Sequence, residues 1–289
     1  MKLEFANVSK RYGKIAAIDG FSISITEPGI YCLLGRNGAG KTSFFKLLSG
    51  QTAAAGGSVT VNNRAVAPLA MPEEVYFVAS DAQQFNLPLQ GLYKAAADIN
   101  PGFDIGFAME MSRRFKLDQK KKFKSLSFGM KAMVNTLIAL ASGREVLLLD
   151  EPVLGFDPIM RKTFYDMLQE STRQGRGAEK QRTVIVSTHI IDEIARVAER
   201  LIIIEKGRPL LFCGIEEIDE KAYSVTGPVD AVKAATKGLN IIAETRAGGF
   251  LSHSVYDRRI GESGNYSIAA LGLQDFFVSL VGGSTEEMQ

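Results

Sequence analysis

The sequence predicts an α/β fold: a mostly parallel sheet core with an N-terminal antiparallel β subdomain, a helical insert and a small C-terminal α+β module. Short, fully apolar runs such as 30–34 and 146–149 alternate with segments of helical periodicity, which is typical of a parallel sheet covered on both faces. Residues 3–26 instead alternate apolar and polar side chains, as antiparallel strands do. Residues 88–142 have a helical texture throughout.

Each segment supports this architecture in turn. Gly13 and Gly20 mark tight turns within the N-terminal strands. Further strands are expected at 58–61, 75–79, 145–151, 183–187 and 201–205. Helices are expected at 92–99, 104–115, 127–143, 158–172 and 190–200. Beyond residue 215 the patterns weaken, with strands expected at 223–225, 240–245 and 249–256 and helices at 229–236 and 273–281.

We therefore expect a large first domain over 1–215, with its helical subdomain at about 88–142, and an accessory module over 216–289. The net charge of the 289 residues is +2, so composition gives no general attraction to nucleic acid. The local basic run 120–124 has the pattern of a solvated helix face or loop.

The remaining composition points to a soluble protein. Cys32 and Cys213 lie in apolar runs, as reduced and buried core cysteines do. The first residues alternate like a strand rather than forming a signal peptide, and no apolar run is long enough to cross a bilayer. We therefore expect a soluble protein that reaches a membrane only through a partner.

Residues 35–42, Gly-Arg-Asn-Gly-Ala-Gly-Lys-Thr, fit the pattern G-x-x-x-x-G-K-S/T between an apolar strand and a helix. The glycines let backbone N–H groups turn inward around an anion at the N-terminus of the helix. Lys41 would reach the β- and γ-phosphates as part of the catalytic set, and the Thr42 hydroxyl would be a Mg²⁺ ligand. The expected phosphate-binding residues are Gly35, Asn37, Gly38, Ala39, Gly40, Lys41, Thr42 and Ser43.

Two carboxylates and a histidine follow later strands. Asp150 ends a buried strand, where it can face Thr42 on the metal side, and Glu151 beside it could deprotonate an attacking water. His189 follows the strand at 183–187 and could donate to a γ-phosphate, stabilising charge in the transition state. We expect Glu151, His189 and Lys41 to be the catalytic residues.

Tyr12 and the start of the third insert helix are weaker candidates. Tyr12, beside a turn, could stack on an adenine ring or could simply pack on the sheet. Ser127 is a good N-cap, and Gly129 would let another group approach the helix start closely. A helix N-terminus with a serine can bind phosphate, although most such serines only cap. Because it lies in a separate segment, a second copy of the chain could supply this site.

These features occur in an order that resembles the ATP-binding subunit of ABC transporters, over residues 1 to about 215. The resemblance implies a P-loop NTPase (RecA-like) core. Six features match: Tyr12 as the adenine-stacking aromatic, 35–42 as Walker A, 126–130 as the signature, 146–151 as Walker B with its glutamate, 154–158 as the D-loop and 187–189 as the switch histidine.

The resemblance also implies how such a chain works. It implies a dimer, of identical or different ATPase subunits, that holds two MgATP at its interface, each between one subunit's Walker motifs and the other's Ser127 and Gly129. It implies an integral membrane permease on a separate chain as partner and no nucleic acid. The subunit would be cytoplasmic, peripheral on the inner face of the cell membrane. The C-terminal module is similar to that of some bacterial exporter-type subunits, including those of GntR-regulated operons.

Two departures from the family pattern put parts of this in doubt. The signature reads LSFGM rather than LSGGQ, with Phe128 and Met130 where glycine and glutamine are usual. The family pattern also has a glutamine, that of the Q-loop, on the metal side of the site, and this position aligns near Ser80 or Asp81. We expect Asp81 to serve as a metal ligand in its place. Two alternatives therefore stay open: a soluble ABC-type ATPase that is not linked to transport, and a regulatory nucleotide-binding subunit that hydrolyses poorly.

Overall fold

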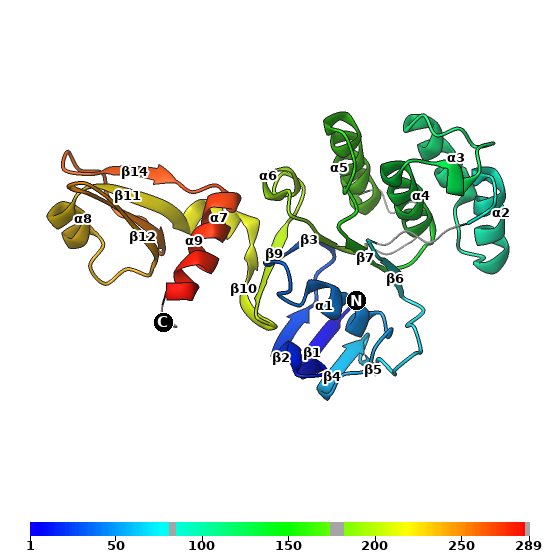
Figure 1. Cartoon of the computed structure of the whole chain (residues 1–289), viewed down its shortest axis with the longest axis horizontal. Coiled ribbons are helices and arrows are strands. Elements are labelled where there is room, and N and C mark those ends of the chain that lie inside the picture. The colour runs from blue at the N-terminus through cyan, green and yellow to red at the C-terminus, as the bar shows by residue number, and fades with distance from the viewer. Residues whose placement is uncertain (81–84, 174–181, 287–289) are drawn as a thin grey trace. The chain divides into compact units, whose positions relative to one another are not determined.

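The computed structural model describes residues 1–80, 85–173 and 182–286 (Figure 1). The chain forms two compact units, the first containing Met1–His189 with Arg200–Phe212 and the second Ile190–Glu199 with Cys213–Gln289. The second unit thus takes in a short segment that precedes residue 215. The functional division into 1–215 and 216–289 stays a prediction.

A mostly parallel sheet forms the centre of the first unit. Its six strands, counted over the described residues, follow the order β10-β9-β3-β8-β7-β6. Strands β3, β6, β7, β8 and β9 pair in parallel, and every residue of β3, β7 and β8 is buried. The predicted fold class is confirmed. The strands are β3 (Gly29–Leu34), β6 (Val75–Val78), β7 (Val146–Asp150), β8 (Thr183–Ser187), β9 (Arg200–Glu205) and β10 (Arg208–Gly214).

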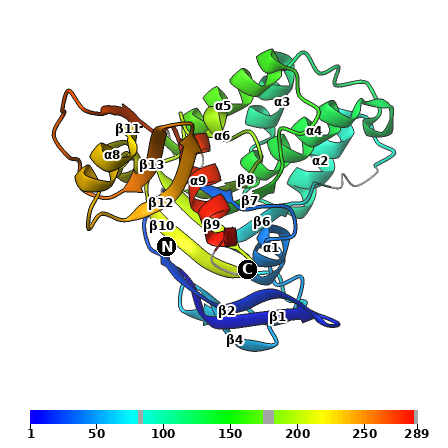
Figure 2. The same cartoon turned by 60° about the vertical axis from the view of Figure 1, so that its left-hand side comes forward.

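An antiparallel sheet, of order β2-β1-β4-β5, packs on the same core through helix α1 (Lys41–Leu48), which lies between the two sheets (Figures 1 and 2). Phe44 of α1 stacks on Phe5 of β1 with ring centroids 4.5 Å apart, and both rings are fully buried. This contact fixes the start of α1 against the sheet. The strands are β1 (Leu3–Tyr12), β2 (Ile15–Ile25), β4 (Gly56–Val61) and β5 (Arg64–Ala65).

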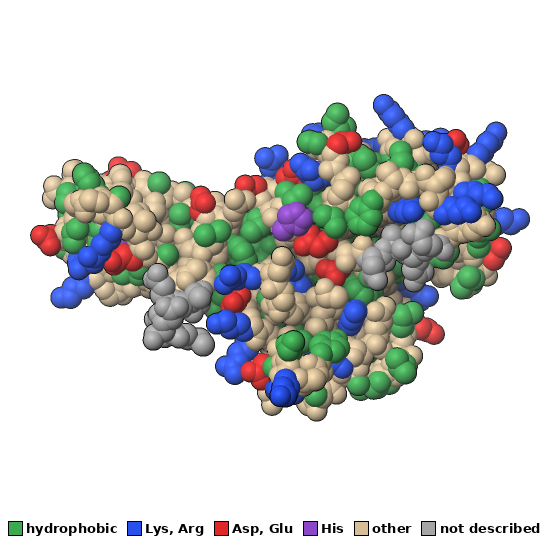
Figure 3. Space-filling model, in the orientation of Figure 1, with side chains coloured by type: hydrophobic (Ala, Val, Ile, Leu, Met, Phe, Trp, Pro, Cys, Tyr) green, Lys and Arg blue, Asp and Glu red, His purple; other side chains and the backbone are tan. Residues whose placement is uncertain are grey.

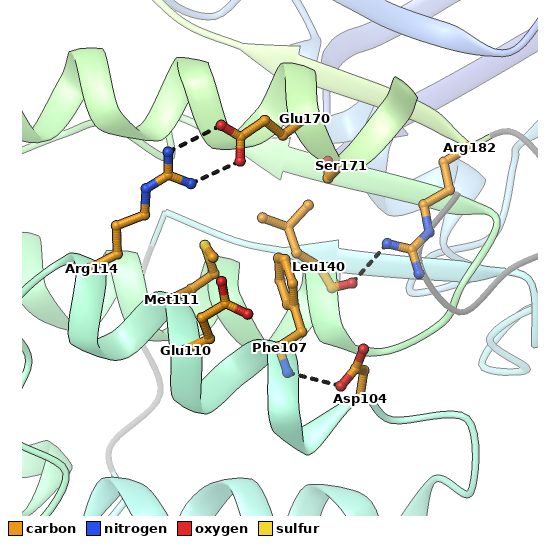
Figure 4. A pocket seen from close by; sticks show the side chains of 9 residues that line it. All are labelled: Asp104, Phe107, Glu110, Met111, Arg114, Leu140, Glu170, Ser171 and Arg182. Atoms are coloured by element: carbon orange, nitrogen blue, oxygen red, sulfur yellow. Dashed lines mark hydrogen bonds and ion pairs between the residues drawn. The ribbon is translucent and has the colours of Figure 1, made fainter. Parts of the chain in front are cut away.

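The helical insert lies beside β6 and β7 (Figure 1). Asp104 accepts a hydrogen bond from the Phe107 N–H and so caps α3, while Arg114 at the end of α3 donates two hydrogen bonds, of 2.8 and 3.0 Å, to Glu170 of α5 (Figure 4). The insert is thereby joined to a core helix. Its elements are α2 (Leu89–Ile99), α3 (Ile105–Arg114), the 3₁₀ turn η1 (Phe123–Ser125) and α4 (Phe128–Ala141), with α5 (Pro158–Arg173) following β7.

The second unit is a small α+β arrangement around an antiparallel sheet of order β12-β13-β11-β14. Its core gathers Tyr223, Val225, Val232, Leu251 and Val255. The elements are α6 (Ile191–Ile194), α7 (Ile215–Lys221), β11 (Ala222–Pro228), α8 (Val229–Ala235), β12 (Ile241–Ala247), β13 (Phe250–Tyr256), β14 (Ser267–Ala270) and α9 (Leu273–Glu286).

The expected helix over 190–200 is wrong in its length. Helix α6 ends at Ile194, and the next turn is tightened because Val197 N–H bonds to the carbonyl of Ile194, three residues earlier. Strand β9 then begins at Arg200, paired with Tyr31. The helix has to end early so that Arg200 can pair with Tyr31 in this register. Helix α7 and strands β10 and β14 were not expected from the sequence.

Candidate nucleotide-binding site

The loop at 35–40 leaves β3 and enters α1 at Lys41, and two of its glycines are required by close backbone approaches. A Cβ on Gly35 would lie 2.5 Å from the Ile204 carbonyl oxygen. Gly40 has φ +113°, and a Cβ there would overlap the Ala17 carbonyl oxygen. Strands β2 and β9 therefore hold the loop from two sides, and only glycine fits at these positions.

The N-terminus of α1 is open to an anion. Gly40 is its N-cap and supplies no side-chain hydrogen bond, so the first N–H groups of the helix have no side-chain cap. Lys41 Nζ donates to the carbonyl oxygens of Gly35 at 2.7 Å and Arg36 at 3.3 Å, which folds the ammonium group over the loop. Both features bring positive charge to the place where phosphate is expected.

Asp150 joins three elements at the carboxyl end of the sheet. Its side chain is almost fully buried, with Oδ2 accepting from Thr42 Oγ1 at 2.7 Å and Oδ1 accepting from Ser187 Oγ at 2.5 Å. Both carboxylate oxygens therefore have a donor, as burial of a charge demands. Thr42 and Asp150 are thus in direct contact, and their roles at a metal position remain predictions.

Glu151 and His189 lie next to this pair. Glu151 has φ +50°, a left-handed backbone that costs about 1 kcal/mol in a residue with a Cβ. Its N–H donates to Ser187, and its Oε2 lies 2.8 Å from His189 Nδ1. The His189 side chain is 62% exposed and that of Glu151 only 21%. A histidine beside acidic side chains is visible on the face shown in Figure 3.

These residues surround an open hollow of about 360 Å³, which is large enough for part of a nucleotide. Glu151 faces into the hollow, and His189 lies one hydrogen bond behind it. Beneath the site Cys32 is a free, buried cysteine, as expected, and burial first and the charge of Glu151 second raise the pKa of its thiol. The hollow is lined by Ile15, Ala17, Asn37, Gly38, Ala39, Gly40, Lys41, Thr42, Ser43, Ser80, Asp150 and Glu151.

The structure does not bring every candidate to this hollow. Tyr12 lies outside its lining and is 46% exposed, with Lys10 Nζ 5.0 Å from its ring centroid. Ile15 and Ala17 of the next strand do line the hollow. Asp81 lies outside the described residues, and its neighbour Ser80 does line the hollow. The roles of Tyr12 and Asp81 remain predictions.

The signature residues lie apart from the hollow within one chain. Ser127 caps α4 by accepting from the Met130 N–H at 3.3 Å, and its side chain is exposed. Gly129 is buried, and a Cβ on it would lie 2.5 Å from the Gly155 carbonyl oxygen. Phe128 between them is 48% exposed. The glycine therefore serves the packing of α4 on residues 154–158. The phosphate contacts expected of Ser127 and Gly129 remain predictions.

Sequence reasoning missed Ser187, Ile15 and Ala17 as members of the site. Ser187 has a signal that could have identified it, because it is a polar residue that ends a buried strand next to the strand of Asp150. Ile15 and Ala17 carry no such signal, since only the fold of β2 over the loop brings them there.

Comparison with known proteins agrees with this geometry. Residues 18–154 match the family described as "ABC transporter". The Nod factor export ATP-binding protein I of Burkholderia orbicola (strain AU 1054) is 30% identical over 229 residues, which span 72% of this chain and 69% of that protein. The chain belongs to the ABC transporter ATP-binding family. Another member, ABC transporter ATP-binding protein YtrB of Bacillus subtilis (strain 168), is 25% identical over 86% of this chain and 84% of its own length.

Solved structures share the fold. The ATP-binding subunit of an ABC transporter matches with a TM-score of 0.66 and 21% identity, over 75% of this chain and 92% of that one. A dimeric ATP-binding cassette in a post-hydrolysis state, bound to ADP and Pi, matches with a TM-score of 0.62 and 20% identity, over 74% of this chain and 98% of that one.

Membership of the ABC family gives the chain its activity, which is ATP binding and hydrolysis in an ATP-driven transporter subunit. Subunits of this family generally dimerise and pair with membrane transporter components. Within the described part of this chain, no helix has the length and apolar character that a membrane span requires.

Proposed function

We propose that this ABC subunit hydrolyses MgATP as half of a head-to-tail dimer and powers export through a separate membrane-spanning partner. The observation that carries the proposal is the paired arrangement beside the loop, in which Thr42 is bonded to Asp150 and the adjacent Glu151 to His189. Each pair supplies a different part of the chemistry.

The first pair suits the metal of MgATP. The Thr42 hydroxyl and Asp150 carboxylate are hard oxygen donors, and among the described residues no group of three His, Cys, Asp or Glu side chains gathers to hold a metal. Magnesium would take these protein ligands, with Asp81 as a further expected one, and complete its shell with phosphate oxygens and water, as it prefers. When bound, it would neutralise charge on the β- and γ-phosphates.

The second pair suits the activation of water. Glu151 is partly buried at the edge of the hollow, where its carboxylate can accept a proton as water attacks the γ-phosphorus. His189 holds that carboxylate through Nδ1 and leaves its ring largely exposed, available to donate to a γ-phosphate oxygen. Lys41, folded over the loop, would turn to the phosphates when they arrive.

Two further observations support the dimer. The hollow is open, and Ser127, the expected second phosphate contact, caps an exposed helix start elsewhere on the chain. A second copy that presents Ser127 to this loop would complete the site. The export direction is supported by the relatives whose names describe Nod factor export.

Turnover by purified variants tests the catalytic assignments. Lys41→Ala should abolish ATP binding, and Glu151→Gln should keep binding while hydrolysis falls about 100-fold or more, because the base is lost. Glu262→Gln, at an exposed site of the second unit, is the matched control and should hydrolyse ATP normally. Hydrolysis that survives in Glu151→Gln would remove Glu151 from the mechanism.

Capture of partners from membranes tests the transport assignment. The proposal expects a multi-span membrane protein to co-purify with the tagged chain, and recovery of ribosomes instead would favour the soluble alternative. The LSFGM sequence, with its exposed Phe128, motivates the regulatory alternative. Absence of turnover in the complete complex with its partner would favour that alternative over the ATPase motor.

A further inference from the structure

The helical insert carries an unusual concentration of positive charge. Residues 113–124 contain seven basic side chains and one acidic side chain, Asp118, in a chain whose total charge is only +2. Figure 3 shows Lys and Arg side chains gathered over this part of the molecule. We define the lysine patch as Lys116, Lys120, Lys121, Lys122 and Lys124, all of which are exposed.

The lysine patch has no internal counter-charge. Over the part of the chain that the structure describes, none of its five ammonium groups forms an ion pair or a side-chain hydrogen bond, whereas Arg114 beside it is held by Glu170. Asp118 uses one carboxylate oxygen to accept from the backbone N–H of Lys120. The five charges are therefore available to an external anion.

The patch is also rigidly mounted. Leu117, Phe123 and Leu126 alternate with the lysines and are buried, so they anchor the segment from below. Its backbone is bonded to the start of α2, where Leu89 N–H donates to Lys121 at 3.1 Å and Gln90 N–H donates to Gln119 at 3.0 Å. The lysines consequently point outward from a fixed loop, and little backbone entropy is lost when they bind.

We propose that the lysine patch is a contact surface for anionic phospholipid headgroups. Clusters of four to eight basic residues next to a membrane attract anionic lipids, and lysines, as compact point charges, suit scattered headgroup phosphates. The proposal rests on the proposed function, because work on a membrane-spanning partner is what would bring the patch near a bilayer. The patch then adds a direct attraction between the ATPase subunit and the bilayer beside that partner.

The chemistry of the patch favours lipid over single-stranded nucleic acid. Proteins that bind single strands place exposed aromatic rings among their basic residues, so that bases can stack. Here Phe123 is fully buried and packs edge-on against Phe85, with ring centroids 5.3 Å apart, and Phe115 is partly covered. The patch offers charge without a stacking surface.

Vesicle co-sedimentation of the purified full-length subunit tests this proposal. Wild type should bind vesicles of phosphatidylcholine mixed with phosphatidylglycerol, should ignore vesicles of phosphatidylcholine alone, and should be released by salt. Neutralising Lys120, Lys121 and Lys124 together to Gln should lower partition onto anionic vesicles about 100-fold, at roughly five-fold per lysine. A matched variant that changes exposed Lys14, Lys233 and Lys237 to Gln should bind as wild type does.

Three outcomes would overturn the lipid surface: no binding of wild type to anionic vesicles, an equal loss in both triple variants, or tighter binding of an RNA or DNA duplex at the same salt. ATP turnover of each variant, measured without vesicles, reports separately on the proposed function. A wild-type protein that does not hydrolyse ATP would count against the ATPase assignment. The vesicle experiment would still measure lipid binding independently of that result. An active wild type that ignores anionic vesicles would remove the lipid contact alone.

Discussion

Asp150 occupies the point where β7, β8 and the start of α1 meet, and each of its carboxylate oxygens accepts one side-chain hydroxyl. The partner from β8 is Ser187, which also accepts from the Glu151 N–H at 3.1 Å. One serine thus orients both acidic residues. This arrangement gives Ser187 a positioning role at the site, which depends on the register of β7 against β8.

Ser187→Ala should therefore lower stability and turnover together. A buried carboxylate oxygen loses its donor, which costs roughly 1–3 kcal/mol, and Asp150 is then free to turn away from Thr42. Urea unfolding and ATP turnover measure the two effects. Ser58→Ala, at an exposed position of β4, is the control, and equal stability of the two variants would contradict the orienting role.

Gly129 illustrates how a residue with an expected ligand contact can have a packing role within its own chain. Gly129→Ala should destabilise the protein by about 1–3 kcal/mol, because the added methyl group meets the Gly155 carbonyl oxygen at 2.5 Å. Gly91→Ala in α2 is the matched control, since its new methyl group would meet only Pro88 at 3.5 Å. It should gain up to about 1 kcal/mol of helix stability. Thermal unfolding compares the two variants. A Gly129→Ala variant as stable as wild type would contradict the packing role, because residues 154–158 would then have moved aside from the methyl group at no cost in stability.

At the scale of elements, the last helix of the chain depends on a similar contact. A Cβ on Gly283 of α9 would overlap the carbonyl oxygen of Ile242 in β12, whereas one on Gly282 would meet nothing within 4 Å. The two adjacent glycines thus differ in what they contribute. Gly283 lets the helix backbone lie directly on the strand.

Gly283→Ala should consequently loosen α9 from β12, while Gly282→Ala should be neutral or gain up to about 1 kcal/mol from helix propensity. Amide hydrogen exchange in β12 is the direct measurement, with faster exchange expected only in Gly283→Ala. Identical exchange in the two variants would mean that the contact does not hold the helix.

The structure shows which helices, strands and loops could be predicted from the sequence. Strands β3, β7 and β8 and the 35–42 loop were predictable because their signals, an apolar run and fixed glycine spacing, are local. The early end of α6 and the position of Ile15 over the loop were not predictable, because both depend on strand pairings distant in sequence. Ser187 was visible as a strand end, but its bond to Asp150 required the register of β7 against β8.

At the scale of the whole molecule, the proposed function makes the chain one of two ATPase subunits in a dimer. Its loop supplies positive charge and a hydroxyl to one nucleotide, and the end of β7 supplies two acidic residues. Its Ser127 lies on another surface, available to a second copy. Such a division makes hydrolysis dependent on assembly. It also places Phe128, the largest departure from the family pattern, beside the expected shared contact.

The shared site is tested most directly by the molar mass of Glu151→Gln in solution, measured by light scattering with and without saturating MgATP. We expect a monomer without nucleotide and a dimer with it, because bound ATP cannot be hydrolysed and joins the two chains. Adding Ser127→Arg to this variant should return it to a monomer, whereas adding Ser58→Arg should leave the dimer intact. A monomer at saturating MgATP, or a dimer that survives Ser127→Arg, would contradict the account.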